Sequence, residues 1–258
     1  MTLETCTKLN VGLNVLRRRP DGYHDIETLF VPYYGFSDIL TVEPADELSI
    51  DIEMEGGAGW DPMQDLTIKA WRALKADFPN LPEVSVRLVK GAPVGAGLGG
   101  GSADAAFMLK ALNELGGLNL DDDALAAYAS RIGSDCAFFI YCRPMIGRGR
   151  GELLEDFDLN LGDRKFRVAI PRDNISGKAV AVSTAEAYGG IVPSEGRTPL
   201  RELLSLPVER WRGLVVNDFE AVVCPRHPEI SALIESFYDE GAVYASMSGS
   251  GSSVLGIF

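Results

Sequence analysis

Cysteine and histidine are scarce in this chain of 258 residues, which contains four cysteines and two histidines. Cys6, Cys136, Cys142 and Cys224 show no Cys-x-x-Cys spacing, so we predict no metal site built from protein ligands. Scattered free thiols suit a reducing compartment, and we therefore expect a cytoplasmic protein.

Long apolar runs are also missing. No stretch approaches 18 consecutive apolar residues, and the first 20 residues lack the apolar segment of a signal peptide, so we expect no membrane partner. The longest run, CAFFIYC at 136–142, has the length of a buried strand or a short core segment.

The chain has fewer positively charged residues than negatively charged ones, 24 against 37. The net charge of −13 argues against a general nucleic-acid binder, because such proteins present basic surface to phosphates. It does not exclude a phosphate site, since backbone amides and one or two local cations can form one. An apolar content of 46% is typical of a globular protein with a real core.

The order of the predicted elements favours an α+β fold. Residues 8–15 alternate polar and apolar side chains, and EVSVRLV at 83–89 has apolar residues at alternate positions, so both stretches predict strands. Helices are predicted from about Ser102 to Leu115, from Asp121 to about Ile132, and over 218–239. A Gly/Arg-rich loop at 143–152 is the best boundary, which gives domains of residues 1–150 and 151–258.

The most unusual stretch is PVGAGLGGGSADAA, from Pro93 to Ala106, which has five glycines within seven residues. It is not a P-loop, because the lysine of that motif is missing. Gly95, Gly97 and Gly100 match the dinucleotide-binding spacing, but the second strand and its acidic end are absent. A third interpretation fits better: bare amides that surround an anion, followed by a helix whose N-terminus adds donors and a positive dipole end.

This loop resembles the central motif of the GHMP small-molecule kinases. The stretches KLNVGLNVLRRRPDGYHDIETLF at 8–30, IGSDCAFFIY at 132–141, NDFE at 217–220 and SMSGSGSSVLGIF at 246–258 resemble one branch of that superfamily. Members of this branch use ATP to phosphorylate the 2-hydroxyl of 4-diphosphocytidyl-2-C-methyl-D-erythritol, in the non-mevalonate route to isoprenoid precursors. The resemblance implies a two-domain α+β fold with the active site in the cleft between the domains.

The resemblance also implies a catalytic pair, Lys8 and Asp135. Asp135 follows a predicted helix C-terminus, where the dipole disfavours an anion, and it precedes an apolar run, so its carboxylate needs a partner. The family match makes Lys8 that partner and implies that both reach the substrate hydroxyl. The triphosphate of ATP is expected on Pro93, Gly95, Ala96, Gly97, Leu98, Gly99, Gly100, Gly101 and Ser102, with Mg²⁺ as counter-charge.

The cytidyl end of the substrate has its own candidates by the same resemblance. Tyr23 is expected to stack on the cytosine and His24 to hydrogen-bond it, while Asn10 contacts the substrate. Tyr188 falls where the family places a second aromatic ring, although core packing is a strong alternative for it. The run Arg17–Arg19 could steer an anionic substrate, but such a run is usually a solvated surface.

Three positions depart from the family pattern. Ala103 replaces the usual second serine of the glycine motif, Ala137 replaces a proline, and Asp65 stands where an asparagine near the adenine is frequent. Alternatives therefore stay open: another GHMP kinase of the homoserine or mevalonate type, a non-catalytic nucleotide-binding protein, or a dinucleotide oxidoreductase. We expect no nucleic-acid partner, and a monomer or weak homodimer.

Overall fold

The computed structural model describes residues 1–258, which fold into two compact units built from interleaved segments. Unit 1 comprises Met1–Lys8, Pro32–Val94 and Gly99–Arg143, and unit 2 comprises Leu9–Val31, Gly95–Leu98 and Pro144–Phe258. Both units combine helices with sheets, which confirms the α+β expectation. The domain boundary at residue 150 stays a prediction. None of the helices is long and apolar enough to cross a membrane.

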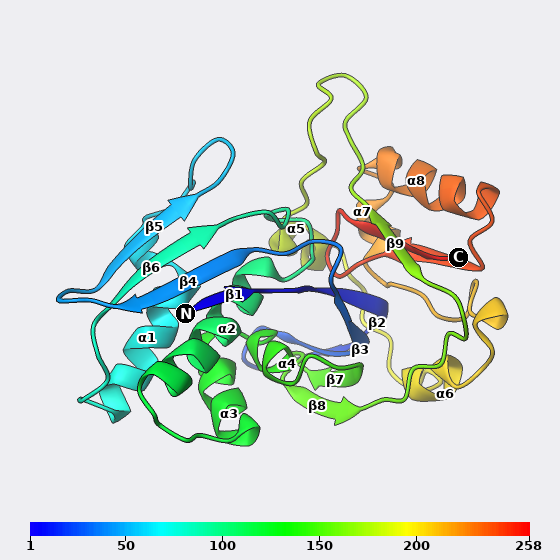
Figure 1. Ribbon diagram of the computed structural model, residues 1–258. Coiled ribbons are helices and arrows are strands. Elements are labelled where there is room, and N and C mark those ends of the chain that lie inside the picture. Colours follow the sequence, from blue (N-terminus) through cyan, green and yellow to red (C-terminus); the bar gives the residue numbers. More distant parts are fainter. The chain divides into compact units, whose positions relative to one another are not determined.

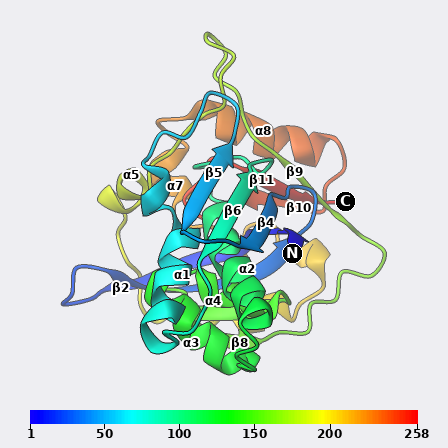
Figure 2. The same ribbon diagram turned by 60° about the vertical axis from the view of Figure 1, so that its left-hand side comes forward.

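Unit 1 is a four-stranded sheet with a layer of helices on one face. The sheet order is β1-β4-β6-β5, with β5 parallel to β6 and the other neighbours antiparallel. In Figure 2 the helices α1 and α2 lie side by side against this sheet. The elements are β1 (Thr2–Glu4), β4 (Ile39–Pro44), β5 (Ser49–Glu53), η1 (Pro62–Gln64), α1 (Leu66–Asp77), β6 (Val84–Val89), α2 (Gly100–Leu115), α3 (Asp122–Ile132) and α4 (Cys136–Tyr141).

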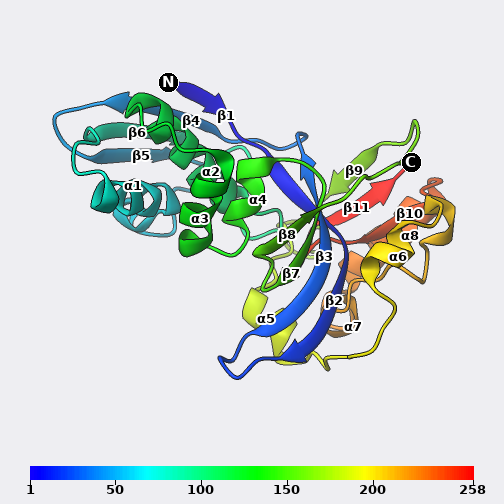
Figure 3. The ribbon, with the colours of Figure 1, turned by 90° about the horizontal axis from the view of Figure 1, so that it is seen from below.

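Unit 2 contains two sheets, of order β2-β3-β7-β8 and β10-β11-β9. Figure 3 shows the long strands β2 and β3 running together, and in Figure 1 the helix α8 lies along the C-terminal sheet, where it contacts β10 and β11. The elements are β2 (Thr7–Arg18) and β3 (His24–Tyr33), both of which begin or end in unit 1, then β7 (Met145–Gly149), β8 (Leu153–Asp156), β9 (Phe166–Ala169), α5 (Thr184–Gly189), α6 (Leu200–Leu204), η2 (Val208–Arg210), α7 (Glu220–Val223), α8 (Pro228–Asp239), β10 (Tyr244–Met247) and β11 (Val254–Ile257).

The predicted strand at 8–15 is confirmed as part of β2, but it is buried on both faces, which its alternating pattern does not predict. Alternation normally marks a strand with one solvated face. Here every residue from Thr7 to Val15 is buried, including Lys8, Asn10 and Asn14. Buried polar side chains need partners, and two of these residues, Lys8 and Asn10, belong to the candidate site.

Two other sequence-based expectations differ from the structure, and one open expectation is decided by it. The run 136–142, expected to be a buried strand or a short core segment, forms the short buried helix α4. The predicted Gly/Arg loop at 143–152 is the hairpin β7–β8, because Gly149 and Gly151, both with positive φ, allow a tight turn. The helix expected over 218–239 is divided into α7 and α8, because Pro228 begins a new helix and lacks the N–H that would continue the first one.

Candidate functional site

The glycine loop ends at the N-terminus of α2, which begins at Gly100, two residues before the predicted start. Gly99 is its N-cap, with φ of +73°. A Cβ atom at Gly99 would lie 3.1 Å from Cγ of Lys8 and 3.2 Å from Cζ of Phe139, so this position requires glycine for both conformation and space. The first three amides of the helix, at residues 100–102, have no intrahelical acceptor, and with the helix dipole they favour an anion.

Lys8 and Asp135 form an ion pair in unit 1, with 3.3 Å between Nζ of Lys8 and Oδ2 of Asp135. The lysine side chain is 5% exposed and the aspartate side chain 32% exposed. The structure therefore brings together the two residues that the family match pairs. Because Gly99 packs against Lys8, the ion pair lies beside the N-terminus of α2. A half-exposed carboxylate next to a buried cation is available to a bound hydroxyl group.

The local environment of Asp135 differs from the sequence-based expectation. From the sequence we expected Asp135 to lie only at the C-terminus of α3, where the helix dipole disfavours its negative charge. In the structure Asp135 is also the N-cap of α4, although its side chain makes no capping hydrogen bond. The positive end of the α4 dipole therefore offsets the effect of α3, and the carboxylate stays available for other partners.

The first half of the glycine loop, residues 95–98, packs within unit 2. Gly95 and Gly97 have φ of +74° and +77°. A Cβ atom at Gly97 would come within 2.6 Å of the Ser248 carbonyl oxygen, whereas one at Gly95 would meet nothing within 4 Å. Ser253 donates its hydroxyl to the Ala96 carbonyl oxygen at 2.7 Å. The C-terminal Ser/Gly segment therefore fixes the shape of this half of the loop.

Asn10 lies on β2 beside the same segment. Its backbone N–H donates to the Ser248 hydroxyl at 3.0 Å, and its side-chain Nδ2 donates to the Thr28 hydroxyl at 3.1 Å. The Thr28 hydroxyl donates in turn to the Gly12 carbonyl oxygen. These bonds orient the buried Asn10 amide in one direction, as a substrate contact would require.

The NDFE motif braces the Ser/Gly segment from the other side. Asn217 donates to the carbonyl oxygens of Met247 and Gly249, both at 2.8 Å, and its Oδ1 accepts from the Phe219 N–H. Glu220 accepts from the Met247 N–H at 2.7 Å. Burial raises the pKa of Glu220 to about 7. The motif is thus a structural support, and the sequence alone did not reveal what it supports.

The three predicted base-binding aromatic residues are arranged differently from one another. His24 and Tyr188 are stacked, with ring centroids 4.9 Å apart and 22° between the planes. Tyr188 also packs edge-on against Phe219 in the core of unit 2. Tyr23 is 58% exposed, with the Arg150 guanidinium 5.1 Å from its ring centroid. Burial, with the charge of Arg18 as a second cause, lowers the pKa of His24 below 6.5, so near neutral pH its ring offers one donor and one acceptor.

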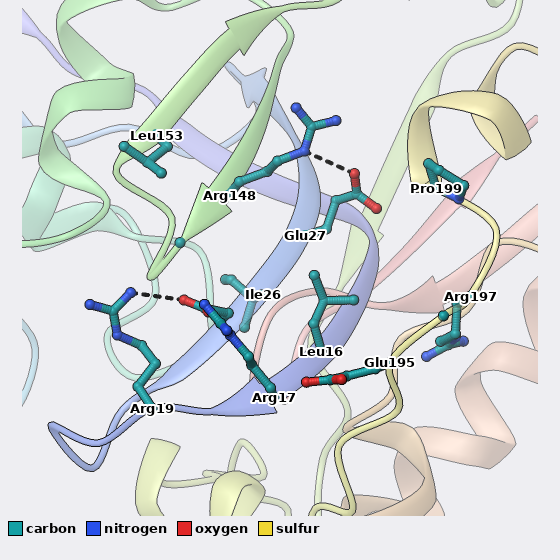
Figure 4. Close-up of a pocket in the computed structure, with 13 residues that line it drawn as sticks. Leu16, Arg17, Arg19, Ile26, Glu27, Arg148, Leu153, Glu195, Arg197 and Pro199 are labelled. Atoms are coloured by element: carbon teal, nitrogen blue, oxygen red, sulfur yellow. Dashed lines mark hydrogen bonds and ion pairs between the residues drawn. The ribbon is translucent and has the colours of Figure 1, made fainter.

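The arginine run 17–19 contributes to a pocket of about 720 Å³ on unit 2. Figure 4 shows Arg19 paired with a carboxylate and Arg148 paired with Glu27. Arg17 and Arg19 both bind Asp25, at 2.5 and 2.8 Å. Since carboxylates in the same pocket already compensate these arginines, the pocket is a poor candidate for steering an anionic substrate.

A buried charge network below the glycine loop was missed by the sequence analysis. Nζ of Lys90 lies 2.5 Å from Asp38 and 2.6 Å from Asp104. Asp38 also accepts the N–H groups of Gly91 and Ala92, at 2.7 and 2.8 Å. Asp104 lies near the start of α2, just after its first turn, so the network ties that helix to the segment leading into the loop. The signal in the sequence was the lysine directly before the loop and the acid directly after it.

Burial governs the protonation of this network. Burial raises the pKa of Asp104 to about 8, and the Oδ1 atom of Asp104 is buried without a hydrogen-bond partner. Burial alone would lower the pKa of Lys90, but the carboxylates of Asp104 and Asp38 raise it. The network therefore holds a cation near Gly100 at the end of the glycine loop, with two acids beside it.

The structure shows where the three residues that depart from the family pattern lie. Ala103 and Ala137 are buried, with 0% and 2% exposure. Asp65 is the N-cap of α1: its Oδ1 accepts from the Thr67 N–H at 2.9 Å, and its Oδ2 accepts from Nε1 of Trp60 at 3.0 Å. Both oxygens of Asp65 are thus used in capping and in fixing the preceding loop.

Comparison with known proteins matches two parts of the chain to two domains of one kinase family. Residues 65–143 match the GHMP kinases N terminal domain, and residues 202–258 match the GHMP kinases C terminal domain. The 4-diphosphocytidyl-2-C-methyl-D-erythritol kinase of Parabacteroides distasonis is 46% identical over 253 residues, covering 97% of this chain and 89% of the relative.

Solved structures agree with this assignment. A crystal structure of 4-(cytidine 5'-diphospho)-2C-methyl-D-erythritol kinase matches with a TM-score of 0.79 and 30% identity, covering 100% of this chain and 90% of the other. The homoserine kinase of Cytophaga hutchinsonii matches with a TM-score of 0.73 at 18% identity over 100% of this chain and 85% of the other, which shows a shared fold. The chain therefore belongs to the 4-diphosphocytidyl-2-C-methyl-D-erythritol kinase family of the GHMP kinases.

Proposed function

We propose that this protein transfers the terminal phosphoryl group of ATP to the 2-hydroxyl of 4-diphosphocytidyl-2-C-methyl-D-erythritol, a step in the non-mevalonate route to isoprenoid precursors. The names of its relatives support the reaction. The observation that carries the proposal is the Lys8–Asp135 ion pair beside the N-cap of the glycine-loop helix. We expect the enzyme to act in the cytoplasm as a monomer or weak homodimer.

In this proposal Asp135 is the group that receives the proton of the attacking hydroxyl. Its carboxylate is the exposed partner of the ion pair, so a substrate hydroxyl can reach it. Lys8 is held in a buried position, where its charge faces the Asp135 carboxylate and can stabilise the substrate oxygen as its proton leaves. The pair acts on the acceptor alcohol, and neither residue needs to form a covalent intermediate.

The phosphate groups are assigned to the glycine loop and the first turn of α2. The amides of Gly100, Gly101 and Ser102 supply donors at the positive end of a 16-residue helix. The chain contains no cluster of three or more His, Cys, Asp or Glu residues that could hold a metal ion. Mg²⁺ is expected on the phosphate oxygens, where it would neutralise phosphate charge.

The cytidyl group is assigned to the aromatic residues of unit 2. His24 supplies a neutral donor and acceptor for the polar edge of the base, Tyr23 supplies an exposed ring for stacking, and Asn10 supplies an oriented amide. The stacking of His24 on Tyr188 makes Tyr188 a support for His24 as well as a candidate base contact.

The proposal is tested by measuring ADP release with ATP and Mg²⁺ in the presence of the cytidyl substrate, homoserine or mevalonate. We expect turnover with the cytidyl substrate alone. Turnover only with homoserine or mevalonate would disprove the substrate assignment and keep the kinase assignment. The absence of turnover with all three, together with nucleotide binding, would indicate a non-catalytic nucleotide-binding protein.

A further inference from the structure

Two cysteines that take no part in the proposed reaction lie in contact in unit 1. The sulfur atoms of Cys6 and Cys142 are 3.6 Å apart, although the residues are 136 positions apart in the sequence. Both thiols are free. Cys6 is fully buried, whereas Cys142 is partly exposed. A disulfide bond is about 2.05 Å long, so the sulfurs would need to approach by about 1.5 Å.

The surroundings of Cys142 favour a reactive thiolate. The Cys142 thiol donates to the Phe139 carbonyl oxygen at 3.1 Å, and Nζ of Lys110 donates to the same oxygen at 3.1 Å, so the ammonium is close to the sulfur. The hydrogen bond from the Cys6 thiol and the charge of Lys110 lower the pKa of Cys142 to about 7. Cys142 and burial raise the pKa of Cys6, while Tyr34, the other ionisable group here, has a raised pKa and stays neutral.

We propose that Cys6 and Cys142 are a redox-modification site, at which a peroxide converts the two thiols to an intramolecular disulfide. In the first step the Cys142 sulfur attacks the peroxide, an S–O bond forms and the O–O bond breaks. The leaving hydroxide takes the Cys142 proton and forms the first water, and Cys142 becomes a sulfenic acid. In the second step the Cys6 sulfur attacks the Cys142 sulfur, the S–S bond forms, and the S–O bond breaks. The leaving hydroxide takes the Cys6 proton, so two thiols and one hydrogen peroxide give a disulfide and two waters.

The position of the pair connects its oxidation to catalysis, and this connection depends on the proposed function. Cys6 lies two residues before Lys8. Cys142 is the C-cap of α4, the six-residue helix whose N-cap is Asp135. Closing the sulfur–sulfur gap pulls the start of β2 and the end of α4 toward each other, which strains the geometry of the Lys8–Asp135 pair. Because a misplacement of about 1 Å can cost a factor of about 100 in rate, we expect kcat to fall by about tenfold or more on oxidation.

The experiment treats the full-length protein with hydrogen peroxide, blocks the remaining thiols, and maps peptides by mass spectrometry without reduction. We expect a Cys6–Cys142 cross-link that dithiothreitol removes, formed faster as the pH rises through about 7. Cys142→Ser and Cys6→Ala should abolish the cross-link. Cys224→Ser is the matched control, because this thiol lies in unit 2 and should leave the cross-link unchanged.

Activity is measured on the same samples before oxidation, after oxidation and after reduction. The expected result is a loss of kcat that dithiothreitol reverses in the wild type and in Cys224→Ser, and that is absent from Cys142→Ser. Failure to detect the cross-link, or a cross-link to another cysteine, would overturn the proposed site. A cross-link with unchanged kcat would overturn its connection to catalysis. If the reduced protein shows no turnover at all, the proposed function fails, while the peptide map still decides whether the site exists.

Discussion

The candidate site residues of unit 1 are charged and paired, whereas those of unit 2 are held by packing and neutral hydrogen bonds. In unit 1 the ion pair Lys8–Asp135 and the network around Lys90 combine buried cations with carboxylates. In unit 2 the candidate residues are uncharged: the rings of His24 and Tyr188 are stacked, and the Asn10 amide is held by a hydrogen bond. The difference follows from the chemistry assigned to each unit, since phosphoryl transfer needs charge stabilisation and a nucleobase needs a flat apolar contact with a polar edge.

The largest effect is expected from Asp135→Asn, which removes the proposed proton acceptor and keeps the shape of the side chain. We expect kcat to fall by about 1000-fold, corresponding to about 4 kcal/mol in the barrier, with the melting temperature nearly unchanged. Asp123→Asn is the matched control, because this exposed carboxylate of unit 1 binds only the Tyr141 hydroxyl at the surface. A variant Asp135→Asn that keeps most of its kcat would remove Asp135 from the mechanism.

The next effect concerns the charge network of unit 1. Lys90→Met leaves Asp38 and Asp104 buried without their cation, and we expect a loss of about 3 kcal/mol in the free energy of unfolding, measured in urea. Lys75→Met, which breaks the partly exposed pair with Glu83, should cost less than about 1 kcal/mol. Equal losses in the two variants would show that the network is not the main electrostatic support of the loop.

In unit 2 the corresponding test is steric. Gly95→Ala and Gly97→Ala introduce the same methyl group at nearly the same positive φ, but only the second meets the Ser248 and Gly251 carbonyl oxygens, at 2.6 and 2.9 Å. We expect Gly95→Ala to cost about 1 kcal/mol of stability and Gly97→Ala about 2 kcal/mol more. Similar losses would mean that the Ser/Gly segment yields easily and does not shape the loop.

The pH dependence of stability tests the buried carboxylate of unit 2. The pKa of Glu220 is raised in the folded state to about 7, above its ordinary 4.5, so its contribution to stability is full below about pH 4.5 and is lost as the pH rises through about 7. Glu220→Gln keeps an acceptor for the Met247 N–H and does not ionise. We expect the variant to be more stable than the wild type at about pH 8, by about 2 kcal/mol, and the difference to vanish at about pH 4.5. Parallel pH profiles in thermal melts would contradict the assignment.

The smallest effect is expected at the cytidyl-binding residues. His24→Ala should raise KM for the cytidyl substrate by about tenfold, or about 1.4 kcal/mol, with little change in kcat or in KM for ATP. Tyr188→Phe keeps the ring that stacks on His24, so both constants should stay close to those of the wild type. A fall in kcat without a change in KM for His24→Ala would move His24 from base binding to the chemical step.

Much of the site could be anticipated from local sequence because it depends on backbone conformation. The alternating glycines at 95, 97 and 99 all have positive φ, which the density of glycine already indicated. The pairing of Lys8 with Asp135 came only from the family resemblance, since 127 residues separate the two in the sequence. The support by NDFE and the Cys6–Cys142 contact gave no local signal, because each joins residues whose neighbourhood arises on folding. For the Lys90 network the sequence showed a lysine and an acid near the loop, but it did not reveal that they pair.

By itself the sequence indicated which glycines adopt positive φ, where a helix follows them and where strands run, because glycine conformation, helix starts and strand alternation are local properties of the backbone. The anion site proposed at this loop rests on the same local properties. The tertiary structure decided which polar residues are buried. The alternation at 8–15 is the same whether its polar face meets water or protein, and only the packing of the folded chain made that face an interior one. Folding then gave Lys8, Asp104, Glu220 and Cys142 their partners. It also altered the pKa of the last three, through burial for Asp104 and Glu220 and through the hydrogen bond with Cys6 for Cys142.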